Sequence, residues 1–148
     1  MDDDALGAWR ALLNVHADVT ARVEAELSGA GLPPLAWYDV LWPLYGAPDL
    51  RLRMGALASQ ATLSRTGLTR LVDRIEAAGL LRREPAPEDR RGAYVVLTPA
   101  GTRMLRRMWP VYEHVLEQSF AGPLRSAATV RRSLERVAAD AATAPADR

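Results

Sequence analysis

The chain opens with a stretch in which apolar residues recur at steps of three and four, with Asp, Arg and Glu between them. This spacing follows the 3.6-residue period of a helix and gathers the apolar positions on one face. The members of this stripe are Leu6, Trp9, Leu13, His16, Val19, Val23 and Leu27. The pattern predicts a long amphipathic helix over residues 5–27.

The next stretch holds three further predicted helices. Glycine and proline at positions 29–34 end the first helix, and the very apolar residues 35–45 predict a second one that Gly46 terminates. Residues 54–61 predict a short third helix. After a connection at 62–64 comes a clearer fourth helix, whose apolar face is formed by Leu68, Leu71, Val72 and Ile75 and which Gly79 closes as a left-handed cap. A short helix, a tight turn and a second helix predict a helix-turn-helix over about residues 54–79.

Two strand-like runs follow, at residues 80–84 and 93–97, and the polar segment 85–92 lies between them. This arrangement predicts a β-hairpin with a long tip. Thr98 then supplies an N-cap and Pro99 the first position of a helix that reaches about Phe120. A last helix is predicted over about residues 125–142. The fold is therefore predicted to be mainly α with a small β-hairpin (α+β).

Charge is strongly segregated along the chain although the formal net charge is only +1. Residues 51–107 hold 12 Arg against 5 acidic residues, a net charge of +7, and the remainder carries a net charge of −6. All 19 basic residues are Arg, which reflects either a GC-rich genome or selection for bidentate recognition. A basic middle segment that coincides with the helix-turn-helix favours a nucleic-acid partner, double-stranded DNA.

The outward face of the fourth helix carries the groups that read base edges in the major groove. Arginine offers a bidentate fork to guanine, and threonine can touch the methyl group of thymine. The expected DNA-binding residues of this region are Ser64, Arg65, Thr66, Thr69, Arg70 and Arg74. The alternative is that these arginines only solvate a surface helix.

The hairpin that follows argues against that alternative. Its tip carries Arg90 and Arg91, and Asp89 lies two residues from Arg91, close enough to orient its guanidinium. Such a tip suits the minor groove. Four more arginines flank the helix-turn-helix and are expected to contact phosphate or solvent, namely Arg51, Arg53, Arg82 and Arg83.

At these positions the sequence resembles the MarR family of regulators. The matching segments are SRTGLTRLVDRIEAAGLLRR (64–83), EDRRGAYVVLT (88–98) and PAG (99–101), and the family's wing motif is met by Asp89, Arg91, Val95, Leu97, Thr98 and Gly101. The resemblance implies a winged helix-turn-helix with an α-helical dimerisation domain. Residues 31–98 would form the DNA-binding domain, with the wing at about 80–98, and residues 1–30 and 99–148 the dimerisation region. It also implies a repressor that binds a pseudo-palindromic operator as a homodimer.

The terminal helices support a dimer independently, because both present apolar stripes with too few partners in so small a chain. The alternative is a bundle within one chain. Members of the family often bind small aromatic or phenolic acids, and the residues that fit such a pocket here are Trp9, His16, Trp37, Trp42, Arg103 and Trp109. Packing in the core or in the dimer explains most of these aromatic residues equally well.

The sequence disfavours several functional classes of protein. The chain has no cysteine, and it carries no phosphate-binding loop, nucleophile elbow or convincing metal-ligand cluster, so no enzyme activity, cofactor or metal is expected. No apolar run approaches the roughly 18 residues of a membrane span, so a cytoplasmic protein without membrane contact is expected. The competing function is a DNA-binding or protein-interaction module without ligand control.

Overall fold

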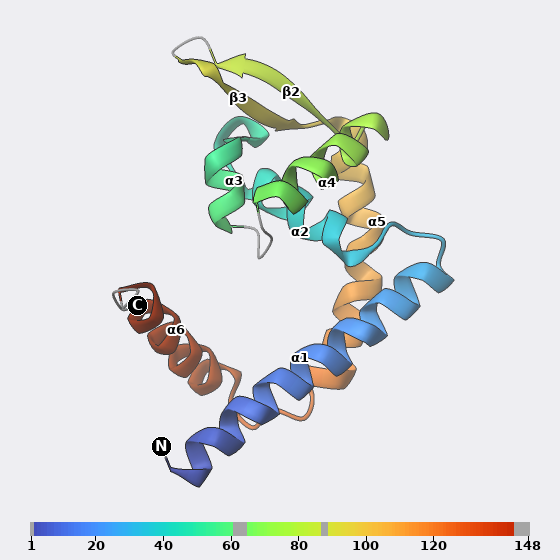
Figure 1. Cartoon of the computed structure of the whole chain (residues 1–148). Coiled ribbons are helices and arrows are strands. Elements are labelled where there is room, and N and C mark those ends of the chain that lie inside the picture. The colour runs from blue at the N-terminus through green and yellow to red at the C-terminus, as the bar shows by residue number, and fades with distance from the viewer. Residues whose placement is uncertain (1, 61–64, 87–88, 144–148) are drawn as a thin grey trace.

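The computed structural model describes residues 2–60, 65–86 and 89–143 and shows a mainly helical protein with one small sheet (Figure 1). Its elements are the helices α1 (Asp3–Gly29), α2 (Leu35–Gly46), α3 (Met54–Gln60), α4 (Arg65–Ala77), α5 (Pro99–Leu116) and α6 (Ala127–Thr143), and the strands β1 (Arg51–Arg53), β2 (Leu81–Ala86) and β3 (Asp89–Leu97). A 3₁₀ turn at Pro48–Leu50 precedes β1, and a π-helical turn at Glu117–Ala121 extends α5. The predicted helices and fold class are confirmed. None of the helices described is long and apolar enough to cross a membrane.

Helix α1 is fixed at both ends by its local sequence. The side chain of Asp2 accepts a hydrogen bond from Ala5 N at 2.6 Å, and two more acidic residues in the first turn complement the helix dipole. At the other end Gly31 adopts a φ of 64°, and Leu32 N donates to Leu27 O at 2.9 Å. The left-handed glycine turns the chain toward the two prolines that precede α2.

The sheet has the order β1-β3-β2 and is antiparallel throughout. The hairpin of β2 and β3 confirms the predicted wing, but two details differ from the prediction. Its strands run farther, to Ala86 and from Asp89, because main-chain pairing continues past the apolar run into residues that the sequence suggested were a loop. Strand β1 was missed altogether, since three residues with one apolar side chain carry too little pattern.

The core lies between the sheet and α2, α3, α4 and α5. Helix α2 runs through its centre and buries Val40, Leu41 and Leu44 completely. Leu57 of α3, Val72 and Ile75 of α4, Val95 of β3 and Met108 of α5 are equally buried. The apolar faces of these helices, among them the face predicted for α4, therefore meet in one cluster, which holds α4 in place.

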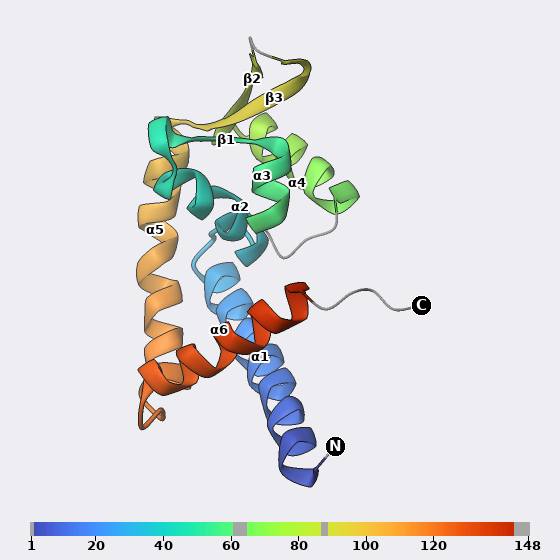
Figure 2. The same ribbon diagram turned by 90° about the vertical axis from the view of Figure 1, so that its left-hand side faces the viewer.

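The two ends of the chain form a helical arm, which Val23 and Leu27 of α1 join to the core. Helices α1 and α5 pack against each other below the lobe that carries the sheet, and α6 projects beside them (Figures 1 and 2). No extensive packing joins α6 to the other described elements. Of its residues 127–141, Val130 alone is half-buried and the rest are exposed.

Candidate nucleic-acid interface

Helix α4 presents one apolar and one polar face. Leu68, Val72 and Ile75 are buried in the core, whereas Thr69 and Arg70 are exposed on the opposite side together with Arg74. Burial of the first face fixes the rotation of the helix, so the second face must point outward. Three of the residues expected to bind DNA thus lie on one accessible surface.

The remaining residues expected to bind DNA lie outside what the structure describes. This holds for Ser64 as a whole, and for the side chains of Arg65, Thr66, Asp89, Arg90 and Arg91. Their backbone positions are nevertheless described. Arg65 is the first residue of α4, and Asp89–Arg91 begin β3 at the outer end of the wing (Figure 1). Roles for these side chains stay predictions.

The junction between α4, the wing and α5 is built on two glycines. Gly79 has a φ of 73° and ends α4, with Leu80 N donating to Ile75 O at 3.2 Å. Thr98 then ties the far end of the wing to this turn, because its hydroxyl donates to Gly79 O at 2.8 Å and also accepts from Gly101 N at 3.0 Å. The turn after α4 and the start of α5 are therefore held as one unit.

Arg83 joins the wing directly to α4. It lies opposite Val95, so its side chain is on the face of the sheet that covers the core. Arg83 Nη2 donates to Asp73 Oδ1 at 2.6 Å, Nη1 donates to Glu76 Oε2, and the backbone N donates to Glu76 Oε1 at 2.7 Å. Burial lowers the pKa of Arg83, but its hydrogen bonds to these two carboxylates outweigh burial and raise the pKa.

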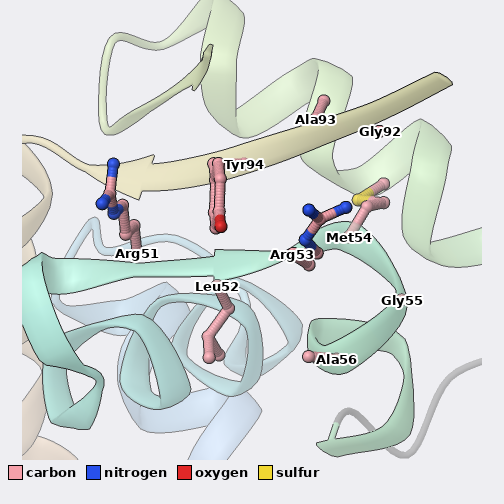
Figure 3. A pocket seen from close by; sticks show the side chains of 9 residues that line it. All are labelled: Arg51, Leu52, Arg53, Met54, Gly55, Ala56, Gly92, Ala93 and Tyr94. Atoms are coloured by element: carbon pink, nitrogen blue, oxygen red, sulfur yellow. The ribbon is translucent and has the colours of Figure 1, made fainter. Parts of the chain in front are cut away.

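The other three flanking arginines lie on the opposite, outer face of the sheet. Arg82 lies opposite Val96, and its Nη2 pairs with Glu84 Oε1 at 2.6 Å. Arg51 and Arg53 bracket the ring of Tyr94 across strands β1 and β3 (Figure 3). The four arginines that looked equivalent in the sequence therefore have three different surroundings.

The predicted ligand residues do not share one cavity within a chain. Trp42 and Trp109 stack with ring centroids 6.0 Å apart and, with Tyr45, Leu105 and Arg106, line an open groove of about 270 Å³. His16 lines a different groove, with Asp39 and Tyr112 among its neighbours. Trp9 is exposed on α1, Trp37 packs beside the core, and Arg103 is exposed on α5. Across the described residues, no three His, Asp or Glu side chains are placed to hold a metal ion.

Arg106, in the groove of Trp42 and Trp109, was not predicted from the sequence, whereas Tyr38, a further aromatic residue that the sequence suggested for a ligand pocket, packs against both of its indoles. Tyr38 stacks on Trp42 at 5.6 Å and Trp109 at 6.4 Å, and it meets Tyr112 edge-on at 5.1 Å. Burial raises the pKa of Tyr38 to about 12, with smaller contributions from Tyr112 and Asp39, so the hydroxyl stays protonated. A spacing of one helical turn between Tyr38, Trp42 and Tyr45 is the signal that could have found the cluster.

Comparison with known proteins agrees with this architecture. A family model described as MarR family matches residues 30–92. The structure of AbsC, a MarR family transcriptional regulator from Streptomyces coelicolor, is 31% identical, with a TM-score of 0.78 over 93% of this chain and 90% of that one. Sco3205, a MarR family regulator of the same organism solved in complex with DNA, is 28% identical, with a TM-score of 0.82 over 99% of this chain and 95% of its own.

A curated relative extends the match beyond that organism. The transcriptional regulator HosA of Escherichia coli O111:H- is 30% identical over 117 residues, which are 79% of this chain and 82% of HosA. These relatives are transcriptional regulators and not enzymes. The fold and site define a winged helix-turn-helix DNA-binding transcription regulator. The chain belongs to the MarR family.

We expect Arg83 to hold the wing and α4 in the relative position that DNA binding requires. Arg83→Gln removes one positive charge and breaks the ion pairs with Asp73 and Glu76. The wing then loses its side-chain ion pairs with α4. The dissociation constant for the preferred DNA sequence should rise about tenfold, since the side chains that contact DNA tolerate only small displacements from one another. Fluorescence anisotropy at fixed salt measures it. Arg82→Gln is the matched control, because it removes the same charge from the opposite face; equal losses in the two variants would show that Arg83 acts through charge alone.

Proposed function

We propose that the protein is a repressor that binds a pseudo-palindromic operator as a homodimer, with residues 31–98 forming the DNA-binding domain. The observation that carries the proposal is the fixed rotation of α4, which buries its apolar face and exposes Thr69, Arg70 and Arg74 beside the wing. A recognition helix lies in the major groove with its N-terminal residues on base edges. A dimer on its operator would block access of RNA polymerase to an overlapping promoter.

The proposal assigns distinct roles to the two parts of the interface. The start and outer face of α4 would read bases in the major groove, through Ser64, Arg65, Thr66, Thr69, Arg70 and Arg74. Arg90 and Arg91 at the wing would enter the adjacent minor groove, with Asp89 orienting Arg91. Two subunits related by a twofold axis would then read two half-sites. The proposal implies that the protein resides on the nucleoid when it is bound.

Residues 1–30 and 99–148 are proposed to form the dimerisation region. Helix α1 leaves Trp9 56%, Leu12 37%, Leu13 47% and Val15 40% exposed, and α6 leaves Leu134 38% and Val137 65% exposed. Most of the stability of a helix in a protein comes from packing of its amphipathic face, and α6 is almost entirely exposed in a single chain. A second copy of the chain supplies the apolar surface that these helices lack.

The test is a mobility shift of the purified protein on the intergenic DNA upstream of its own gene. Excess non-specific competitor is present, and a scrambled duplex of equal length serves as control. A specific complex at nanomolar protein would support the proposal, because specific DNA binding usually exceeds non-specific binding by at least about a thousandfold. If the upstream DNA is not preferred over the scrambled duplex, a binding selection over the whole genome follows. If no genomic fragment is preferred there either, the proposal fails and an interaction module is favoured.

We also propose that a small aromatic effector binds the groove of Trp42, Trp109 and Arg106. The two stacked indoles offer flat apolar walls, and Arg106 adds a cation at the edge.

A panel of aromatic carboxylates and phenols tests this site by quenching of tryptophan fluorescence and release from operator DNA. Trp42→Leu should weaken effector affinity at least tenfold and leave operator affinity unchanged. Trp9→Leu is the matched control, because Trp9 lies on a different helix. If the effector still binds Trp42→Leu but no longer binds Trp9→Leu, its site lies on the helical arm near Trp9 and not in this groove. Absence of any release would favour regulation without a ligand.

A further inference from the structure

A groove of about 330 Å³ lies where α1 meets α2 and the end of α5 (Figures 1 and 2). It shares no lining residue with the groove proposed above for an aromatic effector. Most of its walls are aliphatic side chains of the three helices, and its polar groups come from His16, Thr20, Asp39 and Tyr112. Its volume is at the lower end of the range for small-molecule sites, and apolar walls with a few polar groups are typical of such sites.

The π-helical turn that extends α5 forms one wall of this groove. Phe120 of this turn lines the groove together with Tyr112 of α5. Ser119 Oγ of the same turn accepts a hydrogen bond from Arg22 Nη1 of α1 at 2.9 Å, which ties the turn to the opposite wall. A π-helical turn in an α-helix frequently marks a functional site. Here the turn places a second aromatic side chain in the groove.

Asp39 gives the groove a negative charge, and its side chain is accessible to solvent. No arginine of the described chain lines the groove. Glu24 of α1 lies close by, since its Oε1 accepts a hydrogen bond from Leu35 N at 3.1 Å, one helical turn before Asp39. Desolvation raises the pKa of Asp39, and the charge of Glu24 raises it further. Among the described residues, neither of these two carboxylates forms an ion pair with an arginine.

An organic ammonium ion matches this combination of charge and apolar surface. Its nitrogen would donate charge-assisted hydrogen bonds to Asp39, and an opposite charge there would relieve the repulsion from Glu24. Its apolar body would pack against the aliphatic walls and the rings of Tyr112 and Phe120, which also attract a cation through their faces. An aromatic carboxylate fits poorly, because it would add a third negative charge. A divalent metal ion is also a poor match, because it needs several oxygen ligands and the walls are apolar.

We propose that this groove binds a small organic ammonium ion with an apolar body, whose nitrogen pairs with Asp39. The ligand differs in charge from the aromatic and phenolic acids that the family resemblance implied. His16, expected from the sequence to line a pocket with tryptophans, would instead offer its imidazole to the ammonium group. Because α1 belongs to the helical arm and α2 to the DNA-binding lobe, the bound cation would hold these two parts of the subunit together.

Calorimetric titration of the full chain without DNA tests this site with phenethylammonium, phenethyl alcohol and phenylacetate, which are similar in shape. A pH of about 8 keeps ordinary imidazoles neutral and the amine charged. Phenethylammonium should bind at least about tenfold more tightly than the alcohol, because only the cation gains the charge-assisted interaction with Asp39. Phenylacetate should not compete with the cation, since its charge is repelled by Asp39.

Three variants of the chain locate the site. Asp39→Asn should weaken phenethylammonium binding at least about tenfold and abolish the preference over the alcohol. Asp39→Glu keeps the charge and should retain most of the affinity. Asp18→Asn is the matched control, because Asp18 is exposed on α1 and does not line the groove, and its affinity should equal that of the wild type. Unfolding midpoints verify that each variant is folded.

Four results would overturn the assignment. Equal affinity for the cation and the alcohol would show that Asp39 does not select for charge, and equal losses in Asp39→Asn and Asp18→Asn would reduce the effect to the net charge of the protein. Binding that is lost in Trp42→Leu and kept in Asp39→Asn would place the cation in the other groove. Absence of phenethylammonium binding at millimolar concentration would mean that another occupant, such as side chains of a second copy, fills the groove. Since the titration contains no DNA, none of these results bears on the proposed operator binding.

Discussion

Replacing Gly101 by alanine will lower the free energy of unfolding by about 3 kcal/mol, at the upper end of the usual cost of overpacking. A Cβ atom on Gly101 would lie 2.1 Å from Leu80 O and 2.6 Å from Leu97 Cδ1. The first of these neighbours is backbone, and it also accepts the hydrogen bond of Thr98 N at 3.1 Å, so it cannot move without loosening the turn after α4. The start of α5 must separate from the wing to make room.

Chemical denaturation at fixed protein concentration measures this effect. A loss of this size corresponds to a fall of about 10 °C in the melting temperature for a chain of this length. Gly46→Ala is the matched control, because a Cβ at Gly46, the last residue of α2, meets nothing within 4 Å. That variant should unfold at the wild-type midpoint or slightly above it. A Gly101→Ala protein as stable as the control would mean that α5 packs less closely on the wing than the structure shows.

Gly101 also illustrates what the sequence could reveal. The resemblance to the MarR family marked it as part of the wing motif, but a motif does not say why a glycine is needed. The reason is a close approach between two backbones that are far apart in the sequence, at Leu80 and Gly101. Helical periodicity cannot reveal such an approach, because it reports which face of an element is buried and not how near the neighbouring element comes.

The arginines around the helix-turn-helix show the same limit. Apolar periodicity was enough to predict α1 and α4, the cap at Thr98 and Pro99 marked the start of α5, and two strand-like runs around a polar segment predicted the hairpin. The difference between Arg82 and Arg83 depends on the register of β2 against β3, which sends neighbouring residues to opposite faces. The pairing of Arg53 with Tyr94 depends on β1, a strand of three residues that no pattern marked. Charge alone therefore predicted a basic region and could not divide it into separate contacts.

Replacing Leu13 by aspartate will convert the dimer that we propose into monomers. Leu13 is 47% exposed in a single chain, so in isolation a polar residue there should change stability by less than about 0.5 kcal/mol. In a dimer the leucine is buried and contributes about 2 kcal/mol, and twofold symmetry removes it twice. The dimer dissociation constant should therefore rise about a thousandfold, which sedimentation velocity over a dilution series measures. Operator binding should fall with it, because a monomer reaches one half-site.

Ala11→Asp controls for the added charge, since Ala11 is exposed on the same helix but lies outside the apolar stripe. It should remain dimeric at the concentrations where Leu13→Asp dissociates. The alternative of a bundle within one chain predicts a different result, in which α6 covers the stripe of its own chain and Leu13→Asp lowers the unfolding midpoint at every protein concentration. A midpoint that depends on concentration in the wild type, and no longer does so in Leu13→Asp, would be the signature of a second copy, because association stabilises a folded chain only by mass action.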